Sequence, residues 1–198
     1  MEKNNYFTKV RGAYRLMEDQ MPIHAYHNPD HAKDVFYAAS RIAKLEGVSY
    51  EDRFILATAA LLHDIVFVIR AKDNEEKSVE LAKPYLVQLS YSQDQINKIS
   101  ELILATKMPT APKNLLEMII CDSDVDNLGR SDCIKKGYCV KQEIGITDNK
   151  TWDEMQLKFL LINKYYTRSA QELRSDGVKQ NIKQLEEKLK AYAGGASP

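Results

Sequence analysis

The stretch that decides the fold covers residues 26–35 and reads YHNPDHAKDV. Asn28 followed by Pro29 is typical of a helix start, because an Asn side chain can cap the first free amides and Pro fits the first turn. The apolar pattern that follows predicts a helix extending to about Leu45. His31 would then lie in the first turn of this helix.

The segments on either side also predict helices joined by turns. Apolar residues recur every three or four positions between Tyr6 and Met17, as on the buried face of a helix. Strand signals are nearly absent, because no Asn-Gly or Asp-Gly turn separates alternating apolar runs. We therefore expect an all-α domain, a bundle of roughly eight helices.

Capping patterns, in which a short polar residue precedes an acid or amide by three positions, mark further helix starts. They lie at Ser49, Asp73, Ser92 and Thr151. Pro84 falls inside one of the helical patterns, so we expect a kink or break there. The helix that opens at Thr151 is expected to extend through residues 165–166, and the last helix to cover about residues 176–192.

Composition excludes several classes of protein. The 198 residues include 28 Lys and Arg and 28 Asp and Glu, and this balance argues against a protein that grips a nucleic-acid backbone. A hydrophobic fraction of 44% excludes a disordered chain. The apolar stretch at 54–69 is too short to span a bilayer and is interrupted by His63 and Asp64, so no membrane association is expected.

The cysteines and the termini predict the cellular compartment and the extent of the domain. Cys121, Cys133 and Cys139 are odd in number and form no C-x-x-C pair, which predicts a reducing, cytoplasmic compartment. The N-terminus carries no apolar run of the kind that a secretory signal needs. We expect a single domain over residues 1–193 and a flexible tail at 194–198.

The histidines suggest a metal site. The chain has four, at 24, 27, 31 and 63, and the last directly precedes Asp64 at the end of an apolar helix. A charged pair is costly to bury unpaired, so a divalent metal ion is a natural partner. The alternative is a hydrogen-bonded core histidine followed by a C-terminal aspartate. Segment 119–127 offers three acids for a further ligand, or else a solvated helix end.

The order and spacing of the histidines and acids resemble those of a known enzyme family. His31, then His63-Asp64, then an acid about 60 residues later is similar to the HD-domain metal-dependent phosphohydrolases. Residues 26–35 resemble the Tyr-His-Asn-x-x-His-Ala-x-Asp-Val signature of class I cyclic-nucleotide phosphodiesterases. Other segments resemble a small bacterial branch of predicted HD-superfamily phosphohydrolases. These segments are 63–67, 73–78, 121–130 and 156–167, and the likeness covers roughly residues 20–185.

The resemblance implies roles for individual residues. The metal ligands would be His31, His63, Asp64 and Asp124, with Asp122 as the alternative for the last. The resemblance leaves open whether one or two ions bind and whether the metal is Mn, Mg, Fe, Zn, Ni or Co. His27 matches the histidine that protonates the leaving oxygen. The sequence departs from the family at Phe67, where nucleotidase relatives have an acid; Glu75 and Glu76 could take over its acid–base or supporting role, or simply form the charged first turn of a helix.

The same resemblance points to a substrate class. Gln156 and Phe159 match the spacing of a pair that grips a purine, although a surface Gln and a core Phe would give the same pattern. Asn127 follows the last ligand in the matching place. The function implied is hydrolysis of a phosphate ester, with a nucleotide or cyclic nucleotide favoured as this small-molecule partner.

Two other functions compete with this one. A non-catalytic HD-fold module would bind a nucleotide without turning it over, but it would not need the proton donor His27. An HD-type di-iron oxygenase is disfavoured because no histidine follows His63. Whether the chain forms a homo-oligomer is left open.

Overall fold

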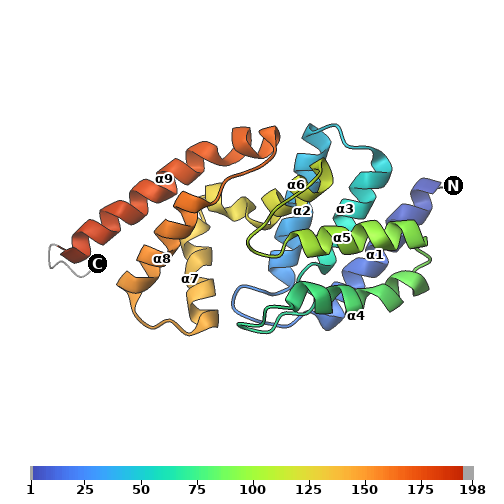
Figure 1. Ribbon diagram of the computed structural model, residues 1–198, viewed down its shortest axis with the longest axis horizontal. Coiled ribbons are helices and arrows are strands. Elements are labelled where there is room, and N and C mark those ends of the chain that lie inside the picture. The colour runs from blue at the N-terminus through green and yellow to red at the C-terminus, as the bar shows by residue number, and fades with distance from the viewer. Residues whose placement is uncertain (1, 194–198) are drawn as a thin grey trace.

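The computed structural model describes residues 2–193 and confirms the all-α prediction (Figure 1). Within this range there are nine α-helices, one short 3-10 helix and no strand. The helices are α1 (Glu2–Gln20), α2 (Pro29–Leu45), α3 (Tyr50–Leu62), α4 (Asn74–Gln88), α5 (Gln93–Ala105), α6 (Leu115–Asp124), η1 (Asp126–Gly129), α7 (Cys133–Ile144), α8 (Asn149–Ile162) and α9 (Arg168–Ala193). The tail expected at 194–198 lies outside the described residues.

Helix α3 forms the centre of the core. It is apolar on nearly all sides and packs against α1, α2, α5 and α6. Leu61 and Leu62 are fully buried, and Ile99 of α5 and Ile119 of α6 are equally inaccessible. Burial of each such side chain stabilises the fold by about 1.5–3 kcal/mol. Because α3 ends inside the protein, the residues that follow it, His63 and Asp64, are buried too.

The predicted start of α2 is confirmed. The Asn28 side chain accepts hydrogen bonds from the backbone N–H groups of Asp30 and His31, at 3.0 and 3.2 Å. Its own amide donates to the carbonyl oxygen of His24 at 3.0 Å. A cap of this kind stabilises a helix by about 1 kcal/mol. Asn28 therefore ties the preceding loop to the first turn of α2 and fixes His31 there.

Pro84 does not break its helix, because α4 continues through it to Gln88, and a kink at Pro84 stays a prediction. Three predicted boundaries are wrong. Helix α8 begins at Asn149, because Asp148 caps it by accepting from the backbone N–H of Thr151 at 2.6 Å, and it ends at Ile162 rather than beyond residue 165. Helix α9 begins at Arg168, eight residues before the predicted start at Asp176.

Tertiary contacts cause the shift at the start of α9. The buried carboxylate of Asp122 accepts hydrogen bonds from the backbone N–H groups of Tyr166 and Thr167, at 2.7 and 2.8 Å. The Thr167 hydroxyl also donates to Asp122 at 2.7 Å and accepts from the N–H of Ala170. A side chain from α6 therefore anchors the N-terminal end of α9, together with the local cap that the Thr167 hydroxyl provides.

Helices α7, α8 and α9 lie together on one side of the molecule (Figure 1). Buried Asp126 of η1 joins them to the core, because Arg174 of α9 and Arg41 of α2 both donate to its carboxylate at 2.8–2.9 Å. Gly177 of α9 approaches η1 so closely that a Cβ there would lie 2.0 Å from the carbonyl oxygen of Gly129. Glycine at 177 is thus required for this crossing.

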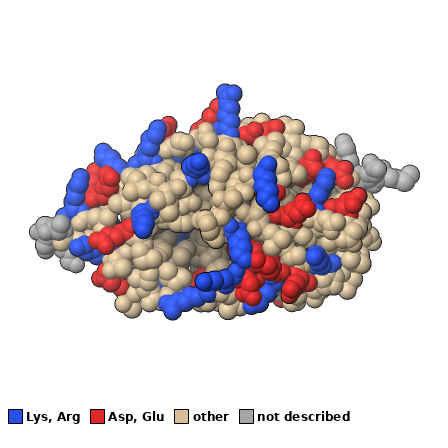
Figure 2. Space-filling view, viewed as in Figure 1, with Lys and Arg blue, Asp and Glu red and all other residues tan. Residues whose placement is uncertain are grey.

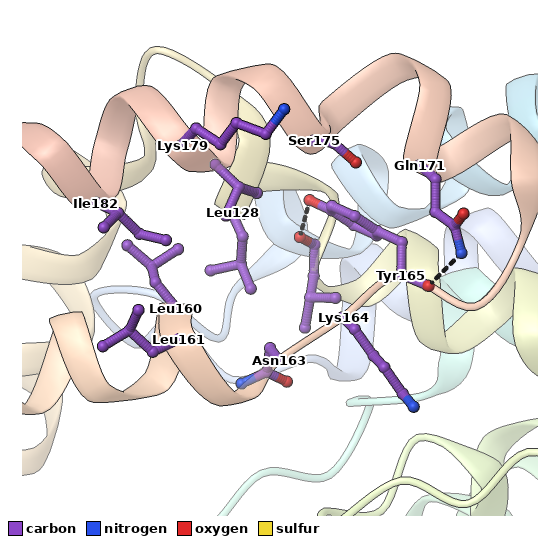
Figure 3. A pocket seen from close by; sticks show the side chains of 12 residues that line it. Leu128, Leu160, Leu161, Asn163, Lys164, Tyr165, Gln171, Ser175, Lys179 and Ile182 are labelled. Carbon is purple, nitrogen blue, oxygen red and sulfur yellow. Dashed lines mark hydrogen bonds between the residues drawn. The ribbon is translucent and has the colours of Figure 1, made fainter.

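A groove of about 440 Å³ runs between α8 and α9 (Figure 3). Leu160 and Ile182 pack beside each other in it. Tyr165, in the connection between the two helices, donates its hydroxyl to the carbonyl oxygen of Val125, and Gln171 donates to the carbonyl oxygen of Tyr165. The described residues that line this groove include no His, Cys, Asp or Glu, so it has no metal-ligand chemistry.

The surface is mixed in charge. In Figure 2 basic and acidic side chains are interspersed over the visible face, which is hollowed between the α7–α9 side and the rest of the molecule. None of the helices among residues 2–193 combines the length and apolar character needed to cross a membrane.

Candidate functional site

Four side chains from three helix ends meet at one place in the core. His31 lies in the first turn of α2, His63 and Asp64 follow the last turn of α3, and Asp124 is the last residue of α6. One ligand atom of each lies within 4.8 Å of the others. The residues expected as metal ligands, with Asp124 as the acid, are thus brought together.

The distances within this cluster suit a shared metal ion. His31 Nε2 lies 3.1 Å from Asp124 Oδ1 and 3.6 Å from Asp64 Oδ2. His63 Nε2 lies 3.1 Å from Asp64 Oδ2 and 3.4 Å from Asp124 Oδ1. Ligand atoms that sit about 2.1 Å from one ion are separated by about 3.0–3.4 Å in octahedral or tetrahedral arrangements. The cluster is therefore close to ligating geometry.

His63 is oriented as a metal ligand would be. Its Nδ1 is 2.9 Å from the carbonyl oxygen of Ala60 and donates to it, so in the neutral ring Nε2 carries the lone pair. That Nε2 is buried and makes no hydrogen bond within the described part of the chain. A backbone carbonyl that holds the far nitrogen is the usual support of a ligating histidine. The donor set of two imidazoles and two carboxylates fits a divalent cation.

The electrostatics of the cluster are strongly coupled. Burial alone would raise the pKa of Asp64, but the charge of His63 and hydrogen bonding with His31 hold this pKa well below its ordinary range. The pKa of Asp124 is lowered in the same way. Conversely, although burial disfavours their charged forms, the two carboxylates raise the pKa of His31 and of His63. Two carboxylates this close, Asp64 buried and Asp124 partly buried, need positive charge beside them.

His27 stands beside the cluster, held by a residue that the sequence did not point to. Its Nδ1 is 2.5 Å from Oε1 of Glu143, and the backbone N–H groups of His27 and Tyr26 donate to Oε2 at 3.0 and 2.9 Å. The ring of Phe67 stacks on the imidazole at 3.5 Å between centroids. His27 Nε2 lies 3.9 Å from Asp64 Oδ2. The imidazole is thus fixed with Nε2 toward the cluster.

Glu143 lies on α7, 116 residues from its histidine partner. Burial would raise its pKa, but the bonds from His27 and from the two backbone amides lower that pKa to about 2. No motif surrounds Glu143 in the sequence, and only the three-dimensional path of α7 brings it here.

The other predicted acids occupy different places. Asp122, the alternative ligand, lies outside the cluster, because its carboxylate accepts the hydrogen bonds that anchor α9. Glu76 forms an ion pair with Lys107, and the hydrogen bond from that lysine lowers the pKa of Glu76. Glu75 is half-buried, and burial together with the nearby charge of Asp64 raises its pKa. Neither glutamate is among the clustered ligands.

The three residues expected to contact substrate line one cavity of about 370 Å³. The cavity begins at His27 and Asp124 and extends between α7 and α8, where Gln156 and Phe159 reach it. Asn127 lies at the metal end, and its Oδ1 accepts from the hydroxyl of Tyr26 at 3.3 Å. Gln156 is only 6% exposed, so it is not the surface residue that the alternative interpretation required.

Comparisons with known proteins found a matching family model and solved structures of similar fold. The family model of the HD domain matches residues 30–126. No curated protein matches the sequence. The structure of Bacillus subtilis YpgQ in complex with ADP is similar, with a TM-score of 0.65 and 21% identity over 91% of this chain and 96% of that one.

Two further solved structures are similar. A Lactobacillus plantarum protein has a TM-score of 0.71 and 16% identity, over 95% of this chain and 96% of that one. A predicted HD superfamily hydrolase from an uncultured Thermotogales bacterium has a TM-score of 0.62 and 19% identity, over 92% of each chain. At these identities the likeness establishes a shared fold.

Proposed function

Because residues 30–126 of this chain match the family model of the HD domain, we propose that the protein is a metal-dependent hydrolase of phosphate esters and that its substrate is a nucleotide. One observation carries the proposal. A single cavity contains both the Asp124 end of the candidate metal cluster and His27, a histidine whose orientation is fixed and whose Nε2 faces that cluster.

His31, His63, Asp64 and Asp124 would hold the ion. A divalent ion in this place supplies Lewis acidity, which lowers the pKa of a water and offsets charge on the phosphoryl oxygens. The cluster is buried on the protein side, with His63 1% exposed, while Asp124 opens onto the cavity. These four residues would therefore bind the ion at the floor of the cavity, where the phosphate of a bound ester can reach it.

His27 would serve as the proton donor. As water attacks phosphorus and gives up one proton to solvent, the bond from phosphorus to the leaving oxygen breaks, and the proton on His27 Nε2 moves to that oxygen. Glu143 accepts the N–H of the other ring nitrogen, which keeps the ring oriented with Nε2 toward the cluster. Glu143 acts through His27 and is a positioning residue.

A nucleotide is supported by the shape of the cavity. The phosphate end is marked by the cluster, and the far end offers the ring of Phe159 on α8 together with the amide of Gln156. The structure of YpgQ, which has the same fold, was solved in complex with ADP. Asn127 lies at the metal end and would contact the substrate near its phosphate.

The test is a panel of esters assayed with Mn²⁺, Mg²⁺, Zn²⁺, Ni²⁺, Co²⁺ and Fe²⁺. AMP, ADP, cyclic AMP and p-nitrophenyl phosphate cover nucleotides and a simple ester. We expect metal-dependent hydrolysis of at least one nucleotide. The His27→Gln variant should lose about 100- to 10,000-fold in turnover. His24→Gln is the matched control, because His24 lies on the same loop but contacts the carbonyl oxygen of Phe67 instead.

The dependence on the leaving group identifies the role of His27. p-Nitrophenolate departs without a proton, whereas a nucleoside alkoxide needs one, so His27→Gln should impair nucleotide hydrolysis far more than hydrolysis of the p-nitrophenyl ester. Equal losses on both would contradict the role as proton donor. Nucleotide binding without product under every metal would instead support a non-catalytic module and refute the hydrolase.

A further inference from the structure

The imidazole of His27 is held at an edge and on a face by different residues. Glu143 accepts from its Nδ1, while the ring of Phe67 covers one face, with 3.5 Å between centroids and 11° between planes. The ring of Tyr26 meets it edge-on, at 5.0 Å and 79°. A histidine side chain rotates about two bonds, and a hydrogen bond to one ring nitrogen fixes only one point of it. The stacked ring fixes the plane that contains both nitrogens.

The backbone on both sides of Phe67 is bound to α4. The N–H of Val66 donates to the hydroxyl of Ser78 at 3.1 Å, and the carbonyl oxygen of Val66 accepts from that hydroxyl at 3.2 Å. Val68 pairs with the side chain of Asn74 in the same reciprocal way, at 2.9 and 3.1 Å. Ser78 and Asn74 are buried on α4. The stacked ring therefore extends from a segment that a helix of the core holds in place.

The same loop is linked to the helix that carries Glu143. Arg70 has a φ of 66°, in the left-handed region that is unfavourable for a residue with a Cβ. Its guanidinium donates to the carbonyl oxygen of Ile144 at 3.2 Å, and Ile144 directly follows Glu143. The segments that supply the edge contact and the face contact of His27 are thus tied to each other.

We propose that Phe67 is a positioning residue for His27, and that its stacked ring, together with Glu143, directs Nε2 of this histidine toward the leaving oxygen of the ester. Phe67 is not among the described residues that line the cavity, so it acts through His27 and not by touching the substrate. The inference rests on the proposed function for the role of His27 as proton donor. The fixed position of the imidazole is tested independently of any reaction.

Proton NMR of the histidine rings measures that position. The spectra are recorded with Zn²⁺, which is diamagnetic, and the chain has only four histidines, so comparison with His27→Gln assigns the resonances of His27. Protons above the face of an aromatic ring resonate upfield, and we expect this for His27 in the wild type. Phe67→Leu, which keeps an apolar side chain without a ring, should move them downfield, whereas Phe67→Tyr should keep them upfield. A wild-type spectrum without upfield-shifted His27 protons would overturn the proposal, even if neither variant folded.

Kinetics test the consequence for proton transfer. With the nucleotide that is hydrolysed best, Phe67→Leu should lower kcat by about 2- to 10-fold at an unchanged KM, the range expected for loss of one stacked pair. Hydrolysis of p-nitrophenyl phosphate should stay at the wild-type rate, and Phe67→Tyr should restore kcat on the nucleotide. Val68→Ala is the matched control, because this side chain is 52% exposed and its backbone keeps the bonds to Asn74. His24→Gln stays a control as well, since glutamine can also donate to the carbonyl oxygen of Phe67.

The outcomes separate this inference from the proposed function. If Phe67→Leu hydrolyses the nucleotide as the wild type does, loses equally on both esters, or changes KM alone, Phe67 does not position the proton donor, even where ester hydrolysis is intact. If no ester is hydrolysed under any metal, the hydrolase proposal fails, and the ring-proton shifts alone decide whether Phe67 fixes His27.

Discussion

Replacing Glu143 by Gln keeps the size of the side chain and removes its charge. Three donors converge on this carboxylate, whose side chain is 1% exposed, and they lower its pKa from the ordinary 4.5 to about 2. A shift of that size corresponds to about 3 kcal/mol of stability at neutral pH. Because an amide keeps one of the two acceptors, we expect Glu143→Gln to lose roughly 2 kcal/mol.

The pH dependence provides the sharper test. A carboxyl group whose pKa is lower in the folded chain stabilises the fold fully above its ordinary pKa and loses this contribution as the pH falls through the folded value. The difference in the free energy of unfolding between wild type and Glu143→Gln should be constant above about pH 6 and narrow between pH 4.5 and about 2. Urea unfolding at several pH values, down to the lowest at which both proteins refold, measures this difference.

The reasoning about Glu143 would be refuted by a difference that does not vary with pH, or by a loss below about 0.5 kcal/mol, the range of an ordinary surface substitution. Activity supplies an independent check. If Glu143 positions His27, the variant should lose more activity on esters with poor leaving groups than on p-nitrophenyl phosphate, as His27→Gln does, but by a smaller factor.

Three further predictions concern the fold and the ion. Gly177→Ala should lower the free energy of unfolding by about 1–3 kcal/mol in urea, because its Cβ would overlap the carbonyl oxygen of Gly129; an unchanged midpoint would argue against the close crossing. Asp124→Asn should lower the metal content measured by elemental analysis. Asp122→Asn should keep the metal and lower the melting temperature, because it weakens the anchor of α9. Loss of metal in Asp122→Asn but not in Asp124→Asn would show that Asp122 is the ligand. Chelation should lower the melting temperature of the wild type by several degrees, because an ion at 100 times its Kd adds about 2.7 kcal/mol to the free energy of unfolding. A melting temperature that changes neither with chelator nor with added Mn²⁺ would contradict a metal site.

Local signals explain what the sequence could predict. Asn28 and Pro29 act on amides within the next three residues, so the start of α2 and the position of His31 were readable from the chain. His63 was equally predictable from the sequence, because an apolar run that ends in a His-Asp pair implies a partner for a buried charge. The all-α class followed from apolar periodicity together with the near-absence of strand signals.

Contacts between distant segments explain what the sequence could not predict. The start of α9 depends on hydrogen bonds to Asp122, a carboxylate of another helix. The choice between Asp122 and Asp124 depends on which side of α6 faces α2 and α3, and a run of three acids does not reveal that. Glu143 contacts His27 because the fold places α7 beside the connection between α1 and α2.

The geometry at the end of α6 limits which insertions and deletions this segment can tolerate. Successive helical residues point about 100° apart, so Asp122 and Asp124 face nearly opposite directions, one toward α9 and the other toward the histidines. Insertion or deletion of a single residue between them would rotate one carboxylate out of its place whatever the identity of the neighbours. The spacing of this short segment is therefore constrained as strictly as its composition, and variation in length is expected only in the loops around it.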